Sequence, residues 1–283
     1  MRKSPTQIQI TMTLNEAISL LKEAGIDSAV HDAREIFSVI DGVDRLTLLT
    51  RLDTVASPKA EAAILRRKGR EPLQYIIGEV AFANELYYVS PDCLIPRSDT
   101  EILVEYAMKH IPRGERFIDL CTGSGCIAIS TLCGTKDTTA VAVDISDAAL
   151  LMAKKNAERN GVRERLSLIR ADLLGGDLSA ISGEYFAVLS NPPYIKNEVY
   201  EGLEPELFHE PKIALVAENA GGIFYERLVP LGLSIIKENG FLAFEIGYDQ
   251  RELLVGLAER YNAKIKVLKD YSGNDRVAVI TKK

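Results

Sequence analysis

The pattern of apolar and polar positions in the first seventy residues differs from that of the rest of the chain, and this first part is helical. There, apolar residues recur every three or four positions, which is the period of one helix face. Thr13 and Glu16 form a capping-box pattern, so a first helix is expected over 13–25. A second is expected over 27–42, and Ser57 followed by proline is typical of a third helix start. The apolar stripes predict a small helical bundle.

The helical period ends at Pro72, and two short extended runs follow. The runs cover 74–80 and 86–89, with turn-forming residues near Asn84 between them. Two such runs around a short turn predict a β-hairpin. We interpret this hairpin as a linker between the helical part and the rest of the chain.

From residue 96 onward, apolar strands alternate with amphipathic helices, as in a parallel sheet covered by helices. Ser98 and Glu101 offer another capping box, and long helices are expected over 147–160 and 223–238. The strands are expected at 117–120, 139–143, 166–170, 186–190, 241–246, 264–269 and 277–281. No helix separates the last two strands, so they should pair as an antiparallel hairpin. The predicted fold class is α/β, a doubly wound sheet with an antiparallel C-terminal hairpin.

These patterns divide the chain into three parts: a helical domain over 1–72, a hairpin linker over 73–95 and an α/β domain over 96–283. The 283 residues are 47% hydrophobic and 26% charged, which fits a globular protein with a sizeable core. No apolar run is long enough to span a bilayer. Residues 1–12 lack the apolar middle of a secretory signal, so a cytoplasmic location is expected.

Cysteine, histidine and net charge restrict the chemistry. The chain has three histidines and no Cys-x-x-Cys pair, so no metal site is expected. The four cysteines are read as small buried thiols: Cys93, Cys121, Cys126 and Cys133. The net charge of −6 argues against a nucleic-acid substrate, which usually requires a basic excess. The basic run over 66–70 is interpreted as the solvated end of a helix.

The first strand of the α/β domain is followed by a glycine-rich turn. In doubly wound sheets this turn usually contacts a cofactor, because glycine lets the main chain approach a ligand closely. Asp144 ends the next strand, where a carboxylate can accept from both ribose hydroxyls. The turn residues expected to bind are Cys121, Thr122, Gly123, Ser124 and Gly125. This combination predicts a nucleoside cofactor, and both NAD and S-adenosylmethionine fit it.

The strand over 186–190 ends in Asn191-Pro192-Pro193-Tyr194, which has the properties of an amine-binding corner. The Asn191 side-chain oxygen and the Pro192 carbonyl are acceptors, and neither proline has an N–H. Such a corner can hold an NH2 group by both hydrogens, and Tyr194 offers an aromatic face to a planar amide or base. Hydride transfer needs no amine site, so S-adenosylmethionine is favoured over NAD.

A further carboxylate follows the third strand of the domain. Asp172 is placed where it can accept from an adenine amino group, with Leu173 against the ring face. A strand-end turn or a helix cap is an equally ordinary role for Asp172 on local grounds. Its position in the series of strand ends favours the cofactor role.

Taken together, the motifs resemble those of the bacterial release factor glutamine methyltransferases, over nearly the whole length of the chain. Members of that family methylate the side-chain amide of the glutamine in the Gly-Gly-Gln motif of peptide chain release factors. The asparagine-proline-proline-tyrosine corner also occurs in DNA adenine methyltransferases, and the other segments are narrower. The segments that carry the resemblance are 72–78 with Phe82, 94–101, 121–125, 190–195, 210–215, 245–247 with Gln250, and 275–277.

The resemblance implies a helical domain that helps to bind the protein substrate, followed by a class I methyltransferase domain. It places Cys121 to Gly125, Asp144, Leu173 and Asn191 against the cofactor, and Asn191, Pro192, Pro193 and Tyr194 around the substrate glutamine. The chain departs from the family at Cys121, where glycine is usual, so we expect a negative φ at that residue. Ser98, Asp99 and the loop over 216–222 depart as well.

The expected mechanism has Asn191 and Pro192 fix the two N–H bonds of the amide while Tyr194 packs on its plane. His209 is a weaker candidate for a general base than for a surface histidine. The alternative function is an adenine methyltransferase acting on nucleic acid, which should display a basic face. A monomer is favoured, because a bulky protein substrate must reach the active-site corner.

Overall fold

The computed structural model describes residues 12–283 and divides into two compact units. One unit contains the chain up to Gly78 together with Pro205–His209, and the other contains Glu79–Glu204 and Glu210–Lys283. The prediction about a secretory signal concerns the first twelve residues, of which eleven lie outside the described part. Each unit is described below by itself.

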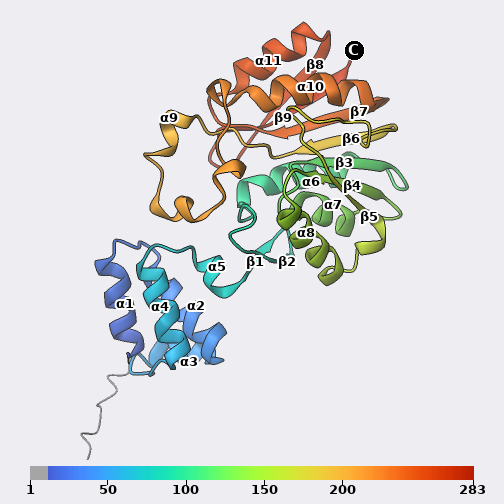
Figure 1. The fold of residues 1–283 in the computed structure, drawn as a ribbon. Coiled ribbons are helices and arrows are strands. Elements are labelled where there is room, and N and C mark those ends of the chain that lie inside the picture. The colour runs from blue at the N-terminus through green and yellow to red at the C-terminus, as the bar shows by residue number, and fades with distance from the viewer. Residues whose placement is uncertain (1–11) are drawn as a thin grey trace, which may run out of the picture. The chain divides into compact units, whose positions relative to one another are not determined.

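The first unit is a helical bundle, as the apolar stripes predicted (Figure 1). The capping box of the first helix is present: Glu16 N donates to Thr13 Oγ1 at 3.3 Å, and Thr13 N donates to Glu16 Oε2 at 2.7 Å. Ser57 Oγ likewise accepts from Ala60 N at the start of α4. The helices are α1 (Leu14–Glu23), α2 (Ala29–Asp41), α3 (Arg45–Thr50), α4 (Pro58–Lys68) and α5 (Leu73–Ile77).

The prediction of an extended run over 74–80 is wrong in its first half. Residues Leu73–Ile77 form the short helix α5, which ends at Gly78 with a φ of 86°. Pro72 precedes the helix, where a missing N–H costs nothing, and its carbonyl accepts from Tyr75 N. Apolar residues of this kind suit a strand or a buried helical turn equally, and burial in the helical unit decides for the turn.

The basic run over 66–70 is not simply a solvated helix end, which corrects a second expectation. Arg67 is only 6% exposed, and its Nε donates to Asp32 Oδ2 at 2.8 Å. Glu206, from the Pro205–His209 segment of this unit, accepts from Arg67 at 2.9 Å and from Arg70 at 2.6 Å. The four residues form a partly buried ion-pair cluster.

Replacing Asp32 by alanine should destabilise the helical unit by about 3 kcal/mol, because it leaves a buried guanidinium with one carboxylate partner fewer. Denaturant unfolding of the full chain, followed by circular dichroism, measures the change. Asp53→Ala is the matched control, since the Asp53 side chain is 74% exposed beside Arg51. An equal midpoint for Asp32→Ala and Asp53→Ala would contradict this account.

The second unit begins with the predicted hairpin. Strands β1 (Glu79–Phe82) and β2 (Glu85–Tyr88) pair antiparallel, with Phe82 opposite Glu85. The two loop residues, Ala83 and Asn84, both have positive φ, which suits the tight turn of a two-residue hairpin. The predicted turn position near Asn84 is therefore confirmed.

The main sheet has seven strands in the order β5-β4-β3-β6-β7-β9-β8. The five strands from β5 to β7 are parallel, and β9 pairs antiparallel with both β7 and β8, as the missing helix between the last strands predicted. The strands are β3 (Arg116–Leu120), β4 (Thr139–Asp144), β5 (Leu166–Arg170), β6 (Tyr185–Ser190), β7 (Ile236–Glu245), β8 (Ala263–Lys269) and β9 (Asp275–Lys282).

Helices cover both faces of this sheet (Figure 1). Alternate residues of each strand enter different cores: Phe117 packs with residues of α6, α7 and α8, whereas Ile118 packs with residues of α10 and α11. The helices are α6 (Glu101–His110), α7 (Cys126–Gly134), α8 (Asp147–Arg159), α9 (Asn197–Tyr200), α10 (Ile223–Ile235) and α11 (Arg251–Arg260). The predicted helix over 223–238 thus ends three residues early, where β7 begins.

The capping box expected at Ser98 is absent. Ser98–Thr100 form a 3-10 turn before α6, and no side chain caps that helix. Glu101 instead accepts from Ala83 N at 3.0 Å, and the Thr100 hydroxyl donates to Glu245. Tertiary partners have replaced the local ones.

Across the described residues, no helix is long and apolar enough to cross a membrane.

Candidate active site

Three strand ends meet at one edge of the sheet and position the predicted site. Leu120 of β3 is paired with Val143 of β4 on one side and with Ser190 of β6 on the other. Asp144 follows Val143, and Asn191 follows Ser190. Both residues therefore lie beside Cys121, which follows Leu120. The strand order reverses between β4 and β6, and ligands of doubly wound sheets bind at such a point.

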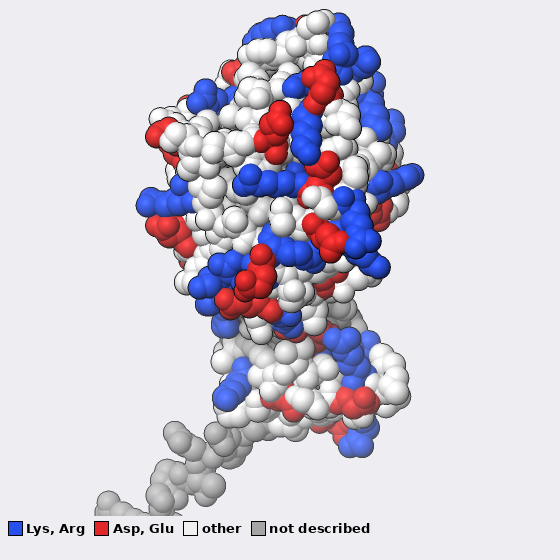
Figure 2. Space-filling view, turned by 90° about the vertical axis from the view of Figure 1, so that its right-hand side faces the viewer, with Lys and Arg blue, Asp and Glu red and all other residues white. Residues whose placement is uncertain are grey.

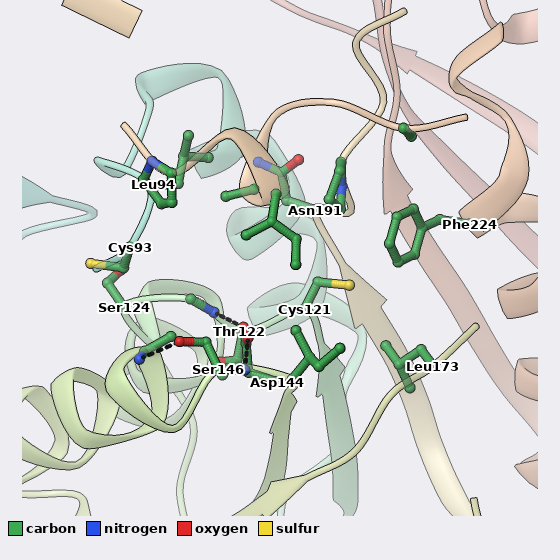
Figure 3. A pocket seen from close by; sticks show the side chains of 18 of the residues that line it. Cys93, Leu94, Cys121, Thr122, Ser124, Asp144, Ser146, Leu173, Asn191 and Phe224 are labelled. Atoms are coloured by element: carbon green, nitrogen blue, oxygen red, sulfur yellow. Dashed lines mark hydrogen bonds between the residues drawn. The ribbon is translucent and has the colours of Figure 1, made fainter. Parts of the chain in front are cut away.

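A cavity of about 780 Å³ lies at this edge (Figure 3). In Figure 3, Asp144 and Ser146 lie on one side of the cavity, and Asn191 and Phe224 lie on the other, with Cys121 between them. Eight of the nine residues predicted to bind the cofactor line it: Cys121, Thr122, Gly123, Ser124, Asp144, Asp172, Leu173 and Asn191. The ninth, Gly125, is not among the lining residues.

Gly125 has a structural role in the turn. Its φ is 83°, and a Cβ at this position would lie 2.9 Å from Ile129 Cδ1 and 3.0 Å from Ala153 Cβ. Only glycine therefore allows α7 to start so close to α8. At Gly123, by contrast, no atom lies within 4 Å of an added Cβ, so the space beside it is open. Open space next to backbone at positive φ is suited to the close approach of a ligand.

Two carboxylates, the buried Asp119 and the partly buried Asp144, hold the shape of the turn. Asp119 accepts from the Thr122 hydroxyl at 2.6 Å, and burial raises the pKa of Asp119 to about 7. Asp144 accepts from Gly123 N at 2.8 Å through one oxygen and from Ser146 N at 3.0 Å through the other. Burial also raises the pKa of Asp144, and these backbone N–H groups oppose the shift. Asp144 thus faces the cavity while its carboxylate ties the glycine turn to the end of β4.

The expectation of a negative φ at Cys121 is wrong. Its φ is 60°, in the left-handed region that glycine adopts without strain and that costs other residues energy. The reason is the path of the chain: Thr122 N donates to Val143 O at 2.9 Å, so the turn must bend sharply straight after Leu120. The cysteine adopts the conformation that the turn requires and bears its cost.

Replacing Cys121 by glycine should therefore stabilise the chain by about 1 kcal/mol through release of this strain. Thermal unfolding monitored by calorimetry measures the effect. Cys126→Gly is the matched control: the same side chain is lost from the first turn of a regular helix, where glycine is destabilising. A lower melting temperature for Cys121→Gly than for the unmodified chain would contradict the strain argument.

Asp172 adopts the turn role that was left open for it and also lines the cavity. Its Oδ1 accepts from Leu174 N at 2.9 Å and from Gly175 N at 3.3 Å. Leu173 is buried beside it and faces the cavity. Sequence reasoning missed other apolar lining residues, among them Leu94, Ile145 and Phe224. Leu94 and Ile145 lie in loops, which have no period that would have distinguished them, and Phe224 lies in the first turn of α10.

The amine-binding corner is only partly in the cavity. Asn191 and Pro193 line it, whereas Pro192 and Tyr194 do not. The Tyr194 hydroxyl donates to Glu245 Oε1 at 3.1 Å, and the Tyr194 carbonyl accepts from Gln250 Nε2. Among the described residues, no protein group donates a hydrogen bond to the carbonyl of Pro192, a buried residue outside the cavity lining.

Two segments that carried the resemblance meet at the wall of the cavity. Glu210 is buried, and its Oε2 accepts from Ile95 N at 3.0 Å while Oε1 pairs with Arg97. Pro96, Arg97 and Pro211 all line the cavity. The two bonds of Glu210 therefore hold the segment 94–101 and the segment 210–215 together as one rim of the cavity. Neither stretch showed this pairing in the sequence.

The cysteines and histidines do not form a reactive cluster. Cys93 and Cys126 are buried, and burial raises the pKa of their thiols to about 11 and about 12. The prediction of buried thiols is wrong for Cys133, which is exposed on α7, and Cys121 is only partly buried. His209 is exposed in the helical unit. Residues 12–283 contain no group of three or more His, Cys, Asp or Glu side chains arranged to hold a metal ion.

Two family descriptions match the chain. The description "PrmC N-terminal domain" matches residues 13–78, and "Methyltransferase small domain" matches residues 98–222. Among solved structures, a release factor-specific protein-(glutamine-N5) methyltransferase from Alicyclobacillus acidocaldarius is 28% identical, with a TM-score of 0.41. That likeness covers 70% of this chain and all of the other.

Curated relatives match over most of their length. A release factor glutamine methyltransferase from Geobacter sulfurreducens is 33% identical over 98% of both chains. The enzyme of the same name from Caulobacter vibrioides is 35% identical, over 95% of this chain and 96% of the relative. A third, from Fusobacterium nucleatum, is 35% identical over 95% of this chain and 77% of the relative. The chain therefore belongs to the release factor glutamine methyltransferase family.

Proposed function

We propose that this protein transfers a methyl group from S-adenosylmethionine to the side-chain amide nitrogen of the glutamine in the Gly-Gly-Gln motif of release factors. The observation that supports this most is the position of Asn191, an amide acceptor in the wall of a cavity that the glycine turn and Asp144 also line. The curated relatives carry the name of this activity. Adjacent cofactor and amine sites are what methyl transfer to nitrogen requires.

The cavity fits the proposed cofactor in its chemistry. Asp144 would accept hydrogen bonds from the ribose hydroxyls. The open space beside Gly123 lets a ligand come close to the main chain there. Leu173 and Phe224 supply apolar surface for an adenine ring, with Asp172 as the acceptor for its amino group. When bound, S-adenosylmethionine supplies an electrophilic methyl group on a positively charged sulfur.

The work left to the protein is to orient a weak nucleophile. An amide nitrogen shares its lone pair with the carbonyl, so the site must hold the nitrogen in line with the methyl group. We propose that Asn191 Oδ1 and the Pro192 carbonyl accept the two amide hydrogens. Both acceptors favour the positive charge that develops on nitrogen. Tyr194, held through its hydroxyl at Glu245, closes this corner and packs on the amide.

No general base is assigned to the reaction. The nitrogen becomes acidic as it accepts the methyl group, so its proton can pass to water. The thiols of Cys93 and Cys126 stay protonated at neutral pH because burial raises the pKa of both. His209 belongs to the helical unit and is exposed, which supports its interpretation as a surface residue.

A nucleic-acid substrate is the rival that the test must exclude. The face in Figure 2 shows basic and acidic side chains interspersed, with no continuous basic patch over this side of the molecule. Together with the net charge of −6, this disfavours phosphate-backbone binding. We further propose that the enzyme acts in the cytoplasm, where release factors work, and that it acts as a monomer.

The experiment that tests the proposal is methylation with labelled S-adenosylmethionine in three parallel reactions. One contains a release factor, one contains the same factor with its Gly-Gly-Gln glutamine changed to alanine, and one contains duplex DNA. Label should enter only the unmodified release factor. Label in DNA would favour the adenine methyltransferase, and equal label in the altered factor would place the modification at another residue.

A further inference from the structure

Asn191 has a side chain whose two ends differ, and only one end is useful to the proposed reaction. Its oxygen must face the substrate, because Oδ1 can accept a hydrogen bond from the N–H of the substrate amide, whereas Nδ2 can only donate one. A side-chain amide can turn by 180° with little change of shape. The protein must therefore contain something that selects one orientation.

The selecting contact comes from the start of α6. Asn191 Nδ2 donates to Thr100 Oγ1 at 3.2 Å, and Thr100 Oγ1 donates to Glu245 Oε2 at 2.5 Å. Thr100 and Glu245 are both only 2% exposed, so water does not compete for these bonds. Glu245 is the last residue of β7, whose Phe244 is paired with Ser190. The carboxylate and Asn191 therefore leave neighbouring strands at the same level.

The direction of this chain of hydrogen bonds is fixed by counting protons. A carboxylate only accepts, so it takes the single hydroxyl proton of Thr100. The Thr100 oxygen then has lone pairs and no proton to offer Asn191. The Thr100 oxygen can therefore only accept a hydrogen bond from the NH2 end of the Asn191 amide. If Oδ1 faced it instead, two acceptors would lie against each other with no proton between them. Asn191 Oδ1 is consequently left to face the cavity.

Glu245 is placed to act as a carboxylate in this role. Besides the Thr100 hydroxyl, it accepts from the Tyr194 hydroxyl at 3.1 Å through its other oxygen. Burial raises the pKa of Glu245, while the Thr100 bond, the Arg276 charge and the Tyr194 bond oppose the rise. Asp99 is the other charged group near it and acts in the same direction as burial.

We propose that Thr100 is a positioning residue for methyl transfer, which fixes the amide of Asn191 with its oxygen toward the substrate, and that Glu245 sets the direction of the Thr100 hydroxyl. This rests on the proposed function, because Asn191 is taken as the residue that holds the substrate amide. Thr100 itself acts through Asn191. No local sequence signal marks it, since its partners are 91 and 145 residues away.

The kinetic test compares Thr100→Val, which keeps the shape and removes the hydroxyl, with Thr100→Ser, which keeps the hydroxyl. Thr100→Val should lower kcat for release factor methylation by about 100-fold, the scale of a misplaced catalytic contact, and leave the Kd for S-adenosylmethionine within about threefold. Thr100→Ser should retain most of the rate. The matched control is Thr135→Val, which removes a buried hydroxyl that donates to Thr131 O at the C-terminal end of α7.

A second readout does not depend on turnover. In the nitrogen-15 spectrum, the Asn191 side-chain amide is identified by its absence from Asn191→Ala. Its NH2 signal should lie downfield in the unmodified protein and in Thr100→Ser, and should move toward a solvated asparagine in Thr100→Val. If Thr100→Val does not fold, Thr100→Ala takes its place in both measurements.

The outcomes separate the two claims. If the unmodified protein fails to methylate any release factor, the proposed function is wrong, and the amide spectrum still decides whether Thr100 orients Asn191. If the unmodified protein is active and the valine variant retains its kcat, or its Asn191 signal does not move, the positioning role is wrong. A fall in kcat shared by Thr135→Val would show general destabilisation and would also overturn it.

Discussion

Replacing Asn191 by alanine is expected to lower the rate of methyl transfer by about 1,000-fold, which is the loss found when a preorganised acceptor or donor is removed from an active site. The side chain lines the cavity, and its NH2 end is held by Thr100, so its oxygen is the acceptor offered to a substrate. Single-turnover assays with labelled S-adenosylmethionine and a release factor measure the rate.

The same variant should still bind S-adenosylmethionine, since the glycine turn and Asp144 are untouched. Isothermal titration calorimetry checks this, with a Kd expected within about threefold of the unmodified protein. Asn197→Ala is the matched control, because it removes an exposed asparagine six positions further along, in α9. An Asn191→Ala enzyme with a tenth or more of normal activity would remove this residue from the mechanism.

Replacing Asp144 by alanine should weaken S-adenosylmethionine binding by about 100-fold, from the loss of hydrogen bonds to a charged group. The carboxylate is the expected acceptor for the ribose hydroxyls. It also accepts from Gly123 N and Ser146 N, so its loss frees the glycine turn from the end of β4. Both effects act on the cofactor before any chemistry occurs.

Equilibrium dialysis with labelled cofactor gives the Kd directly. Asp147→Ala serves as the control, since it removes a carboxylate three residues further along whose side chain is 74% exposed beside Arg170. This control should bind normally. If Asp144→Ala and Asp147→Ala bind equally well, the ribose is held by other groups and the assignment of Asp144 is wrong.

The sequence predicted the parts of this fold that local rules determine. Capped helices with an apolar stripe, such as α1 behind Thr13, and continuous apolar strands, such as β6, leave few alternatives. The antiparallel C-terminal pair followed from a loop too short for a crossover helix. The main candidate residues were also placed correctly at one edge, because the ends of parallel strands must meet there.

The failures have a common physical cause, which is competition from distant partners. Glu101 could have capped α6, and bonds the hairpin at Ala83 N instead. Arg67 could have remained in water, and is buried against Asp32. Cys121 could have avoided a positive φ, and the turn at the sheet edge imposes one. Each of these choices depends on residues that local patterns do not connect.

The same limit applies to the site. Asn191 was found because it lies in a motif, whereas its partner Thr100 was noticed only as part of a helix start and of a resembling segment. Glu245 was noticed as part of a resembling segment without a role. The hydrogen bonds that link the three residues span three separate stretches of the chain, and only the folded structure brings them together.

The segment Pro205–His209 has a practical consequence for anyone dissecting the protein. The chain leaves the larger unit at Glu204, contributes Glu206 to the ion pairs of Arg67 and Arg70, and returns at Glu210. A fragment that stops after Gly78 would therefore keep Asp32 beside the buried guanidinium of Arg67 but lose the second carboxylate, Glu206, which also pairs with Arg70. Expression of the bundle on its own calls for neutralising substitutions at these arginines, or for a short graft of the missing five residues.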